Sequence, residues 1–145
     1  MKKMYCIIGV VLLGLAGCSS SADYADWNAL DGEWNVLRVG DYVVDIPGYE
    51  NPDEVPFIGF QPEDGSVYGL LGCNRLVGVR TIDAKHPQVA DFSNLGSTLM
   101  LCEDMKVEDK LLPALRSVVH YQIAPNGYLQ LLDAEGAVVI ELQKR

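Results

Sequence analysis

Cysteine and histidine are the residue types in this chain that can carry nucleophilic chemistry. The 145 residues include four cysteines and two histidines, namely Cys6, Cys18, Cys73, Cys102, His86 and His120. A cysteine nucleophile needs a base within hydrogen-bonding reach, and histidine commonly serves. His86 precedes a proline in a loop-like stretch and His120 ends a helical pattern, so no local motif joins either of them to a cysteine. Gly-x-Ser-x-Gly, paired-histidine and phosphate-loop motifs are also absent from the sequence, and we therefore expect no enzymatic activity.

Pairs of adjacent acidic residues are the other candidate chemistry, because carboxylate oxygens are ligands that Ca²⁺ prefers. Such pairs occur at Asp53-Glu54, Glu63-Asp64, Glu103-Asp104 and Glu108-Asp109. Their spacing does not match the EF-hand loop, and runs of charge usually form a solvated face. We therefore expect no bound metal and no cofactor.

The charge balance limits the classes of partner. The chain has 11 lysines and arginines against 20 aspartates and glutamates, which gives a formal net charge of −9. Such a surface is repelled by phosphate backbones and by anionic membrane faces. Nucleic acid is therefore excluded as a partner, whereas a basic protein is compatible with the charge.

The first 17 residues have the pattern of a secretory leader. Lys2 and Lys3 form a basic start, and residues 5–16 are almost wholly apolar. This run is too short for the roughly 20 apolar residues that a bilayer-spanning helix needs. We therefore predict that residues 1–17 are a signal peptide that is removed from the mature protein.

The end of this leader, Leu-Ala-Gly-Cys18, resembles a bacterial lipobox. The resemblance implies that Cys18 becomes the N-terminus and carries a diacylglycerol, whose two chains give a stable membrane anchor. Residues 18–29 are polar and small, which predicts a flexible tether. Ser19 after the cysteine resembles lipoproteins sorted to the outer membrane. The expected address is therefore the cell envelope, at the outer membrane, with the periplasmic and surface faces both left open.

The remainder of the chain consists mostly of short β-like runs separated by Gly, Pro, Asn and Asp. The runs lie at residues 33–39, 42–46, 55–60, 66–71, 76–82, 89–92, 121–123, 128–132 and 137–142. Asp64-Gly65 and Asn126-Gly127 are typical of hairpin turns. The connections are too short for crossover helices, so we expect antiparallel pairing.

One stretch changes to a helical period. Val107, Leu111 and Leu115 recur at four-residue steps with charged residues between them. Pro113 would cost about 3 kcal/mol inside a helix, so we predict one helix from about Val107, kinked or re-registered at Pro113. The expected fold is α+β, with an antiparallel curved sheet or partly closed β-barrel of about eight strands and one main helix packed on it.

Three motifs in this order resemble a known family. They are Leu-Asp-Gly-Glu-Trp at residues 30–34, Gly-Leu-Leu-Gly-Cys-Asn at 69–74 with Gly78 following, and Ser-Thr-Leu-Met-Leu-Cys at 97–102. Together they resemble the META domain (HslJ-like) family of bacterial envelope proteins and lipoproteins, over residues 30–142. The resemblance implies a small antiparallel β-rich domain with a helix, here residues 30–145. It also implies roles in envelope stress tolerance and no established enzymatic activity.

The motif residues are expected to be structural. They are Gly32, Trp34, Gly72, Asn74, Gly78, Thr98 and Met100. Cys73 and Cys102 occupy both cysteine positions of the motif, in a compartment that favours disulfides. A disulfide there would stabilise the domain by roughly 3.6 kcal/mol in the chain-entropy model. Two buried free thiols are the alternative, since free cysteine is among the most buried residue types.

Two functions follow as expectations. The first is a lipid-anchored, non-enzymatic binding or scaffold module of the envelope, with the membrane as its anchor and a basic envelope protein as its partner. The second is a carrier of a small hydrophobic ligand in a barrel-like pocket of at least ~300 Å³. In that carrier, the pocket would be lined by Tyr68, Leu70, Val77 and Val79.

Overall fold

The structure is a computed structural model that describes residues 26–81, 85–86 and 89–145. The predicted signal peptide, the lipid site at Cys18 and most of the predicted tether lie outside the described residues. Among the described residues, no helix combines the length and apolarity needed to cross a membrane.

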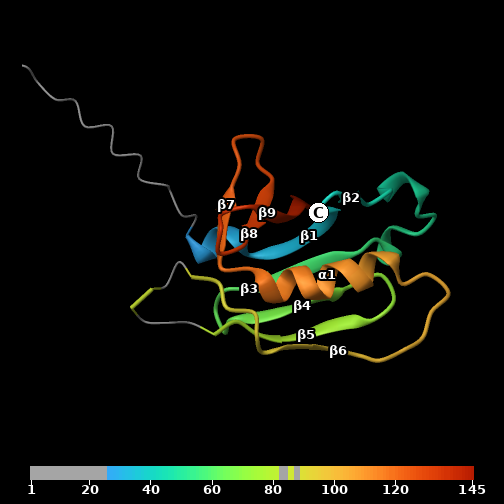
Figure 1. Cartoon of the computed structure of the whole chain (residues 1–145), viewed down its shortest axis with the longest axis horizontal. Helices are drawn as coiled ribbons and strands as arrows, with labels where there is room; N and C mark the ends of the chain where they lie inside the picture. Colours follow the sequence, from blue (N-terminus) through green and yellow to red (C-terminus); the bar gives the residue numbers. More distant parts are fainter. Residues whose placement is uncertain (1–25, 82–84, 87–88) are drawn as a thin grey trace, which may run out of the picture.

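The described part of the chain forms one antiparallel sheet of nine strands. The strand order is β6-β5-β4-β3-β1-β9-β8-β7, with β2 paired to β1. The strands are β1 (Gly32–Val39), β2 (Tyr42–Val43), β3 (Phe57–Gln61), β4 (Ser66–Leu70), β5 (Arg75–Val79), β6 (Leu95–Ser97), β7 (His120–Ile123), β8 (Leu129–Leu132) and β9 (Val138–Lys144). The sheet curls into a half-barrel (Figure 1), with α1 (Lys106–Ser117) packed against it. The predicted fold class is confirmed.

Local sequence explains the helix. Val107, Leu111 and Leu115 are buried together, as the four-residue period predicted. Pro113 lies inside α1 at an exposed position, and the helix continues through it without re-registration. Proline has no backbone N–H, so Pro113 cannot donate a hydrogen bond to the carbonyl of Asp109. Because Asp109 is exposed, water can donate to that carbonyl instead.

Two predicted strands differ from the structure. The predicted strand at 89–92 is reduced to an isolated bridge between Thr81 and Asp91, and the strand that pairs with β5 is β6 instead. Leu-Gly-Ser has weak β-propensity, so β6 exists because of its pairing partner and not because of its composition. The predicted strand at 42–46 is shortened to β2, because the chain turns at Pro47 into the short helix η2 (Ile46–Gly48). A similar turn, η3 (Pro52–Glu54), follows.

The core begins before the predicted domain boundary. Trp27 belongs to the short helix η1 (Trp27–Leu30) and is 8% exposed. Its ring meets Phe60 and Tyr121 edge-on, at centroid distances of 5.6 and 5.8 Å, and the Arg80 guanidinium lies 3.7 Å above it. Trp27 is therefore part of the core, although it lies within residues 18–29, for which a tether was predicted.

The predicted lining of a ligand cavity was wrong. Val67 and Leu76 are the buried large apolar residues of β4 and β5, whereas Val77 and Val79 are 57% and 48% exposed. Tyr68 pairs with Val77 across the two strands and shares its outer face. Successive side chains of a strand alternate between the two faces of a sheet. The prediction assigned the wrong alternate set of residues to the inner face, so all four of the predicted lining side chains lie on the outer face. The inward space is filled by fully buried side chains such as Ile58, Phe60, Leu111, Leu131 and Ile140.

Candidate functional site

A tight turn after β4 brings the central motif against the start of the helix. The backbone amide of Leu71 donates to the carbonyl of Asn74 at 2.8 Å and closes the turn. Gly72 has a φ of +129°, which an L side chain rarely adopts. A Cβ at Gly72 would lie 3.6 Å from Cβ of Val107 and 3.9 Å from the amide nitrogen of Glu108. The turn therefore lies directly on the first turn of α1.

The Asn74 side chain joins this turn to the segment that precedes the helix. Asn74 is 2% exposed. Its Oδ1 accepts from Oγ1 of Thr98 at 2.8 Å and from the amide of Met100 at 2.6 Å. Its Nδ2 donates to the carbonyl of Met100 at 3.0 Å and to Oε1 of Glu108 at 2.7 Å. One buried amide thus binds the chain at residues 98–100 and the helix at once.

Glu108 is a member of this network that the sequence did not reveal. Its carboxylate is 7% exposed, and its Oε2 accepts the backbone amide of Asn74 at 2.8 Å. The prediction that Glu108 and Asp109 form a solvated acidic pair is therefore wrong for Glu108, while Asp109 is exposed. The residue lies in the first turn of α1, where the helix dipole favours negative charge. Its place in the first turn of the helix was the signal that the sequence offered for Glu108. No sequence motif or spacing links Glu108 to Asn74.

The two cysteines form a disulfide. Cys73 and Cys102 are bridged, with their Cα atoms 6.1 Å apart, inside the usual range for a disulfide. The alternative of two free thiols is therefore wrong. Thr98 adds a further attachment, because its Oγ1 accepts the amide of Arg75 at 3.0 Å and its amide donates to the carbonyl of Arg75 at 3.1 Å.

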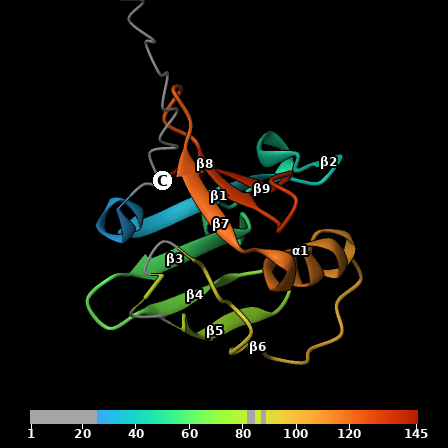
Figure 2. The same ribbon diagram turned by 60° about the vertical axis from the view of Figure 1, so that its left-hand side comes forward.

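These bonds define what we call the 98–104 loop, which runs from Thr98 to Asp104. The loop is attached at Thr98, Met100 and Cys102, yet its three large apolar side chains point outward. Leu99 is 95% exposed, Met100 55% and Leu101 98%. Single exposed apolar residues are common on protein surfaces. Three in succession, on a backbone held by hydrogen bonds and a disulfide, form a defined apolar surface. Figures 1 and 2 both place this loop, between β6 and α1, at the opposite end of the molecule from η1.

The remaining motif residues take part in packing and in backbone geometry. Gly32 opens β1, and Trp34 is 4% exposed with its Nε1 donating to the carbonyl of Leu30 at 2.8 Å. A Cβ at Gly78 would lie 2.5 Å from the Asn94 carbonyl oxygen and 2.9 Å from Cα of Leu95. Glycine at this position therefore lets the chain at 94–95 come close enough for β6 to pair with β5.

The motifs and the fold agree with the comparison of the whole chain with protein families. A family model of the META domain matches residues 27–145. The chain belongs to the META domain family. The matched region starts at Trp27, the residue at which the core begins.

Among solved structures, this META domain is similar to one described as the NMR structure of a protein from Burkholderia xenovorans. The two share 18% sequence identity with a TM-score of 0.58, and the match covers 100% of this chain and 99% of that one. At this identity the likeness shows the fold alone. None of the curated proteins matches the chain.

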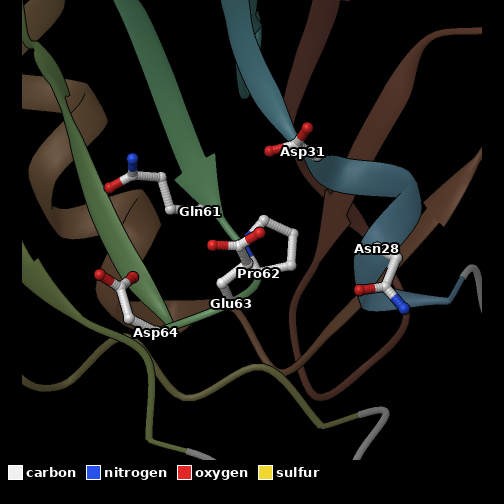
Figure 3. Close-up of a pocket in the computed structure, with 6 residues that line it drawn as sticks. All are labelled: Asn28, Asp31, Gln61, Pro62, Glu63 and Asp64. Atoms are coloured by element: carbon white, nitrogen blue, oxygen red, sulfur yellow. The ribbon is translucent and has the colours of Figure 1, made fainter.

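The surface of the META domain has a polar recess beside the turn that joins β3 to β4. It has a volume of about 390 Å³ and is lined by Asn28, Asp31, Gln61, Pro62, Glu63 and Asp64. Figure 3 shows Asn28 and Asp31 on one side and Gln61 and Asp64 across from them. Hydrogen bonds from the side chain and from the backbone amide of Ser66 lower the pKa of the Asp64 carboxyl. Nowhere in the described ranges do three or more His, Cys, Asp or Glu side chains form a group that could hold a metal.

A second recess adjoins the 98–104 loop. Its volume is about 310 Å³, and it is lined by Tyr42, Asp45, Gly48, Tyr49, Gly72, Asp104 and Val107. Asp104 belongs to both features, so the recess and the loop are continuous on the surface.

Proposed function

We propose that this META-domain protein is a lipid-anchored, non-enzymatic protein-binding module of the bacterial cell envelope, with a role in envelope stress tolerance. Its docking element is the 98–104 loop. The observation that carries the proposal is that Leu99 and Leu101 are almost fully exposed on a backbone held by a disulfide and by Asn74.

The energetics favour this loop as a binding surface. Burying a leucine side chain contributes about 1.5–3 kcal/mol. A loop already fixed in one conformation loses little further entropy when a partner docks. Leu99 and Leu101 therefore offer a binding energy that the folded domain itself does not use.

The position of the loop suits a protein held by its N-terminus. A lipid at Cys18 would lead into the domain at Trp27, at the end that carries η1 (Figure 2). The 98–104 loop lies at the other end, so the anchored domain would present it away from its attachment.

Charge and cysteine chemistry support the remaining parts of the proposal. The net charge of −9, with Glu103 and Asp104 next to the apolar side chains, favours a basic protein partner and a salt-sensitive association. Cys73 and Cys102 are both in the disulfide, so neither supplies the thiolate that a hydrolase would need. No specific observation favours the hydrophobic-carrier alternative.

The test is photo-crosslinking in living cells that express the full lipidated chain. A benzophenone amino acid replaces Leu101 in one strain and Val77, an exposed apolar residue on β5, in a matched strain. We expect a discrete adduct from position 101 that is identified by mass spectrometry as a basic envelope protein and is absent from position 77. The adduct should be lost in a Leu99→Ser background.

Identical adduct patterns from the two positions, or no adduct from position 101, would contradict the proposal. An adduct with phospholipid at position 101 would also contradict it, because the loop would then be a membrane contact.

A further inference from the structure

The recess beside the 98–104 loop has the size of a side-chain site. Its volume of about 310 Å³ is at the lower end of ligand pockets, which span roughly 300–1,000 Å³. Its walls come from segments far apart in the sequence: β2, the η2 turn, the Gly72 turn, the end of the loop and the start of α1. In Figure 1 the segment that follows β2 lies beside the N-terminal end of α1. Such a recess exists only in the folded domain.

The groups that line the recess are those that bind organic cations. Asp45 and Asp104 supply carboxylates, and Tyr42 and Tyr49 supply aromatic rings. Ammonium and guanidinium groups are attracted by aromatic faces and form strong hydrogen bonds with carboxylates. The other recess, near Asp64, has carboxylates but no aromatic ring.

Glycine at position 48 helps to place one carboxylate. A Cβ on Gly48 would lie 2.6 Å from Oδ2 of Asp45. The Asp45 carboxylate therefore lies against the η2 turn where any side chain at 48 would displace it. It makes no capping bond to that turn, so its oxygens are not used by the helix end next to it.

The cations of the chain itself hold this site only loosely. Lys106 Nζ lies 3.9 Å from Oδ2 of Asp104, but both side chains are largely exposed, at 74% and 70%. Lys110 Nζ lies 5.7 Å from the ring centroid of Tyr42. Exposed pairs of this kind are worth about 0–1 kcal/mol, so an incoming cation can replace them. Oδ1 of Asp104 accepts a hydrogen bond from the amide of Lys106 at 3.0 Å. This carboxylate also interacts favourably with the positive end of the α1 dipole.

The electrostatics at Tyr49 agree with a site for positive charge. Burial raises the pKa of its phenol, and electrostatic interactions with Tyr42, Asp104 and Asp45 raise it further. A negative surrounding opposes loss of the phenolic proton. A cation bound in the recess would have the opposite effect, so it should lower the pKa of Tyr49.

We propose that this recess receives one alkylammonium or guanidinium group, carried by a lysine or arginine side chain of the protein that docks on the 98–104 loop. This inference rests on the proposed function and names the partner's chemistry. The shared residue Asp104 places the cation next to the apolar side chains of the loop, so the partner's recognition surface is a basic residue flanked by apolar ones.

The test uses the full lipidated chain in non-ionic detergent micelles, with tyrosine rings labelled for NMR. The probes are Nα-acetyl-lysine methylamide and Nα-acetyl-arginine methylamide, and the neutral control is Nα-acetyl-norleucine methylamide. We expect saturable shifts at Tyr42 and Tyr49 with the cationic probes only. The pKa of Tyr49 should fall when the recess is occupied.

Matched variants assign the effect to the recess. Asp45→Asn combined with Asp104→Asn should weaken binding of the probe about tenfold, which corresponds to about 1.4 kcal/mol. Asparagine keeps a side-chain oxygen that can accept the Lys106 amide in place of Oδ1 of Asp104, so the start of α1 should be preserved. Asp53→Asn combined with Glu63→Gln removes two acids outside the recess and should leave binding unchanged.

Three outcomes would overturn the inference. The first is that the norleucine control causes equal shifts, and the second is that the Asp45→Asn, Asp104→Asn variant binds the probes as well as the wild type does. The third is that free spermidine binds more tightly than either amino-acid probe, which would indicate a soluble amine as ligand. The two proposals fail separately. Leu99→Ser should abolish the crosslinked adduct from position 101 and keep probe binding, whereas absence of probe binding with the adduct intact refutes only the cation site.

Discussion

Asn74 uses every hydrogen-bonding group that it has. Its Nδ2 has two donors and both are used, its Oδ1 accepts twice, and its backbone amide and carbonyl bind Glu108 and Leu71. Glu108 depends on this residue, because a buried carboxylate is stable only when its oxygens are bonded. The two residues therefore act as one unit.

Replacement of Asn74 should destabilise the domain strongly. We expect Asn74→Ala to lower the free energy of unfolding by about 3 kcal/mol. The substitution removes a hydrogen bond to a buried carboxylate, and it leaves hydrogen-bond donors of the 98–104 loop without acceptors. Equilibrium urea denaturation measures the change. Asn51→Ala, which removes an exposed helix-cap acceptor at η3, should cost only about 1 kcal/mol.

A double-mutant cycle separates the pair from simple loss of packing. With Glu108→Ala already present, Asn74→Ala should cost at least about 1 kcal/mol less than it does alone. Additive losses would show that the two side chains do not stabilise each other.

At the scale of elements, the 98–104 loop takes its order from its neighbours and not from its own sequence. It has no repeating secondary structure, and its apolar side chains face solvent. The turn at Gly72–Asn74 binds the loop by hydrogen bonds at Met100 and by the disulfide at Cys102. The β5–β6 pairing leads into it through Thr98, so three separate attachments keep it in one conformation.

Removal of the disulfide should lower stability and yet leave part of the loop in place. Cys73→Ser with Cys102→Ser opens a crosslink between residues 29 apart, so the free energy of unfolding should fall by up to roughly 3.6 kcal/mol. The amide of Met100 remains bonded to Asn74 and should keep its protection in hydrogen exchange at conditions where the domain is folded.

Mass spectrometry provides the control, because the purified wild-type chain should gain two daltons on reduction. Unchanged stability of the serine variant would show that the crosslink does not restrain the unfolded chain. Loss of protection at Met100 would show that Asn74 alone cannot hold the loop.

For the molecule as a whole, the arrangement of its two ends matters most. The core starts at Trp27, at the end of the half-barrel that carries η1, and the 98–104 loop is at the other end (Figure 1). A protein of net charge −9 is not drawn to an anionic bilayer. Attachment would therefore have to be covalent, through the two acyl chains proposed at Cys18.

Substitution of the proposed lipid site should release the protein from membranes. Cys18→Ala should abolish metabolic labelling with palmitate and move the protein out of the membrane fraction, because a net charge of −9 gives the protein no attraction to an anionic bilayer. Cys6→Ser, within the proposed leader, should leave both unchanged. Labelling that persists in Cys18→Ala would contradict the anchor, as would wild-type protein recovered with cytosolic extracts.

Local patterns in the sequence were sufficient for most elements of the fold. Hairpins at Asp64-Gly65 and Asn126-Gly127 form where those turn residues stand, with positive φ at both glycines. The helix forms where the four-residue period places Val107, Leu111 and Leu115 on one face. These features depend on neighbours along the chain, and so they can be read from it. The family motifs also indicated Asn74 and the two cysteines as important positions.

Only the tertiary structure decided what these positions do. Glu108 lies 34 residues from Asn74, and β6 forms because β5 offers an edge that Gly78 leaves accessible. The faces of β4 and β5 depend on the parity of the strand register, which one residue reverses. The order of the 98–104 loop and the composition of its recess come from segments that meet only after the sheet has curled. Contacts between distant segments carry no periodic signal, and this is the physical reason why the sequence determined the elements while the folded chain determined the surface.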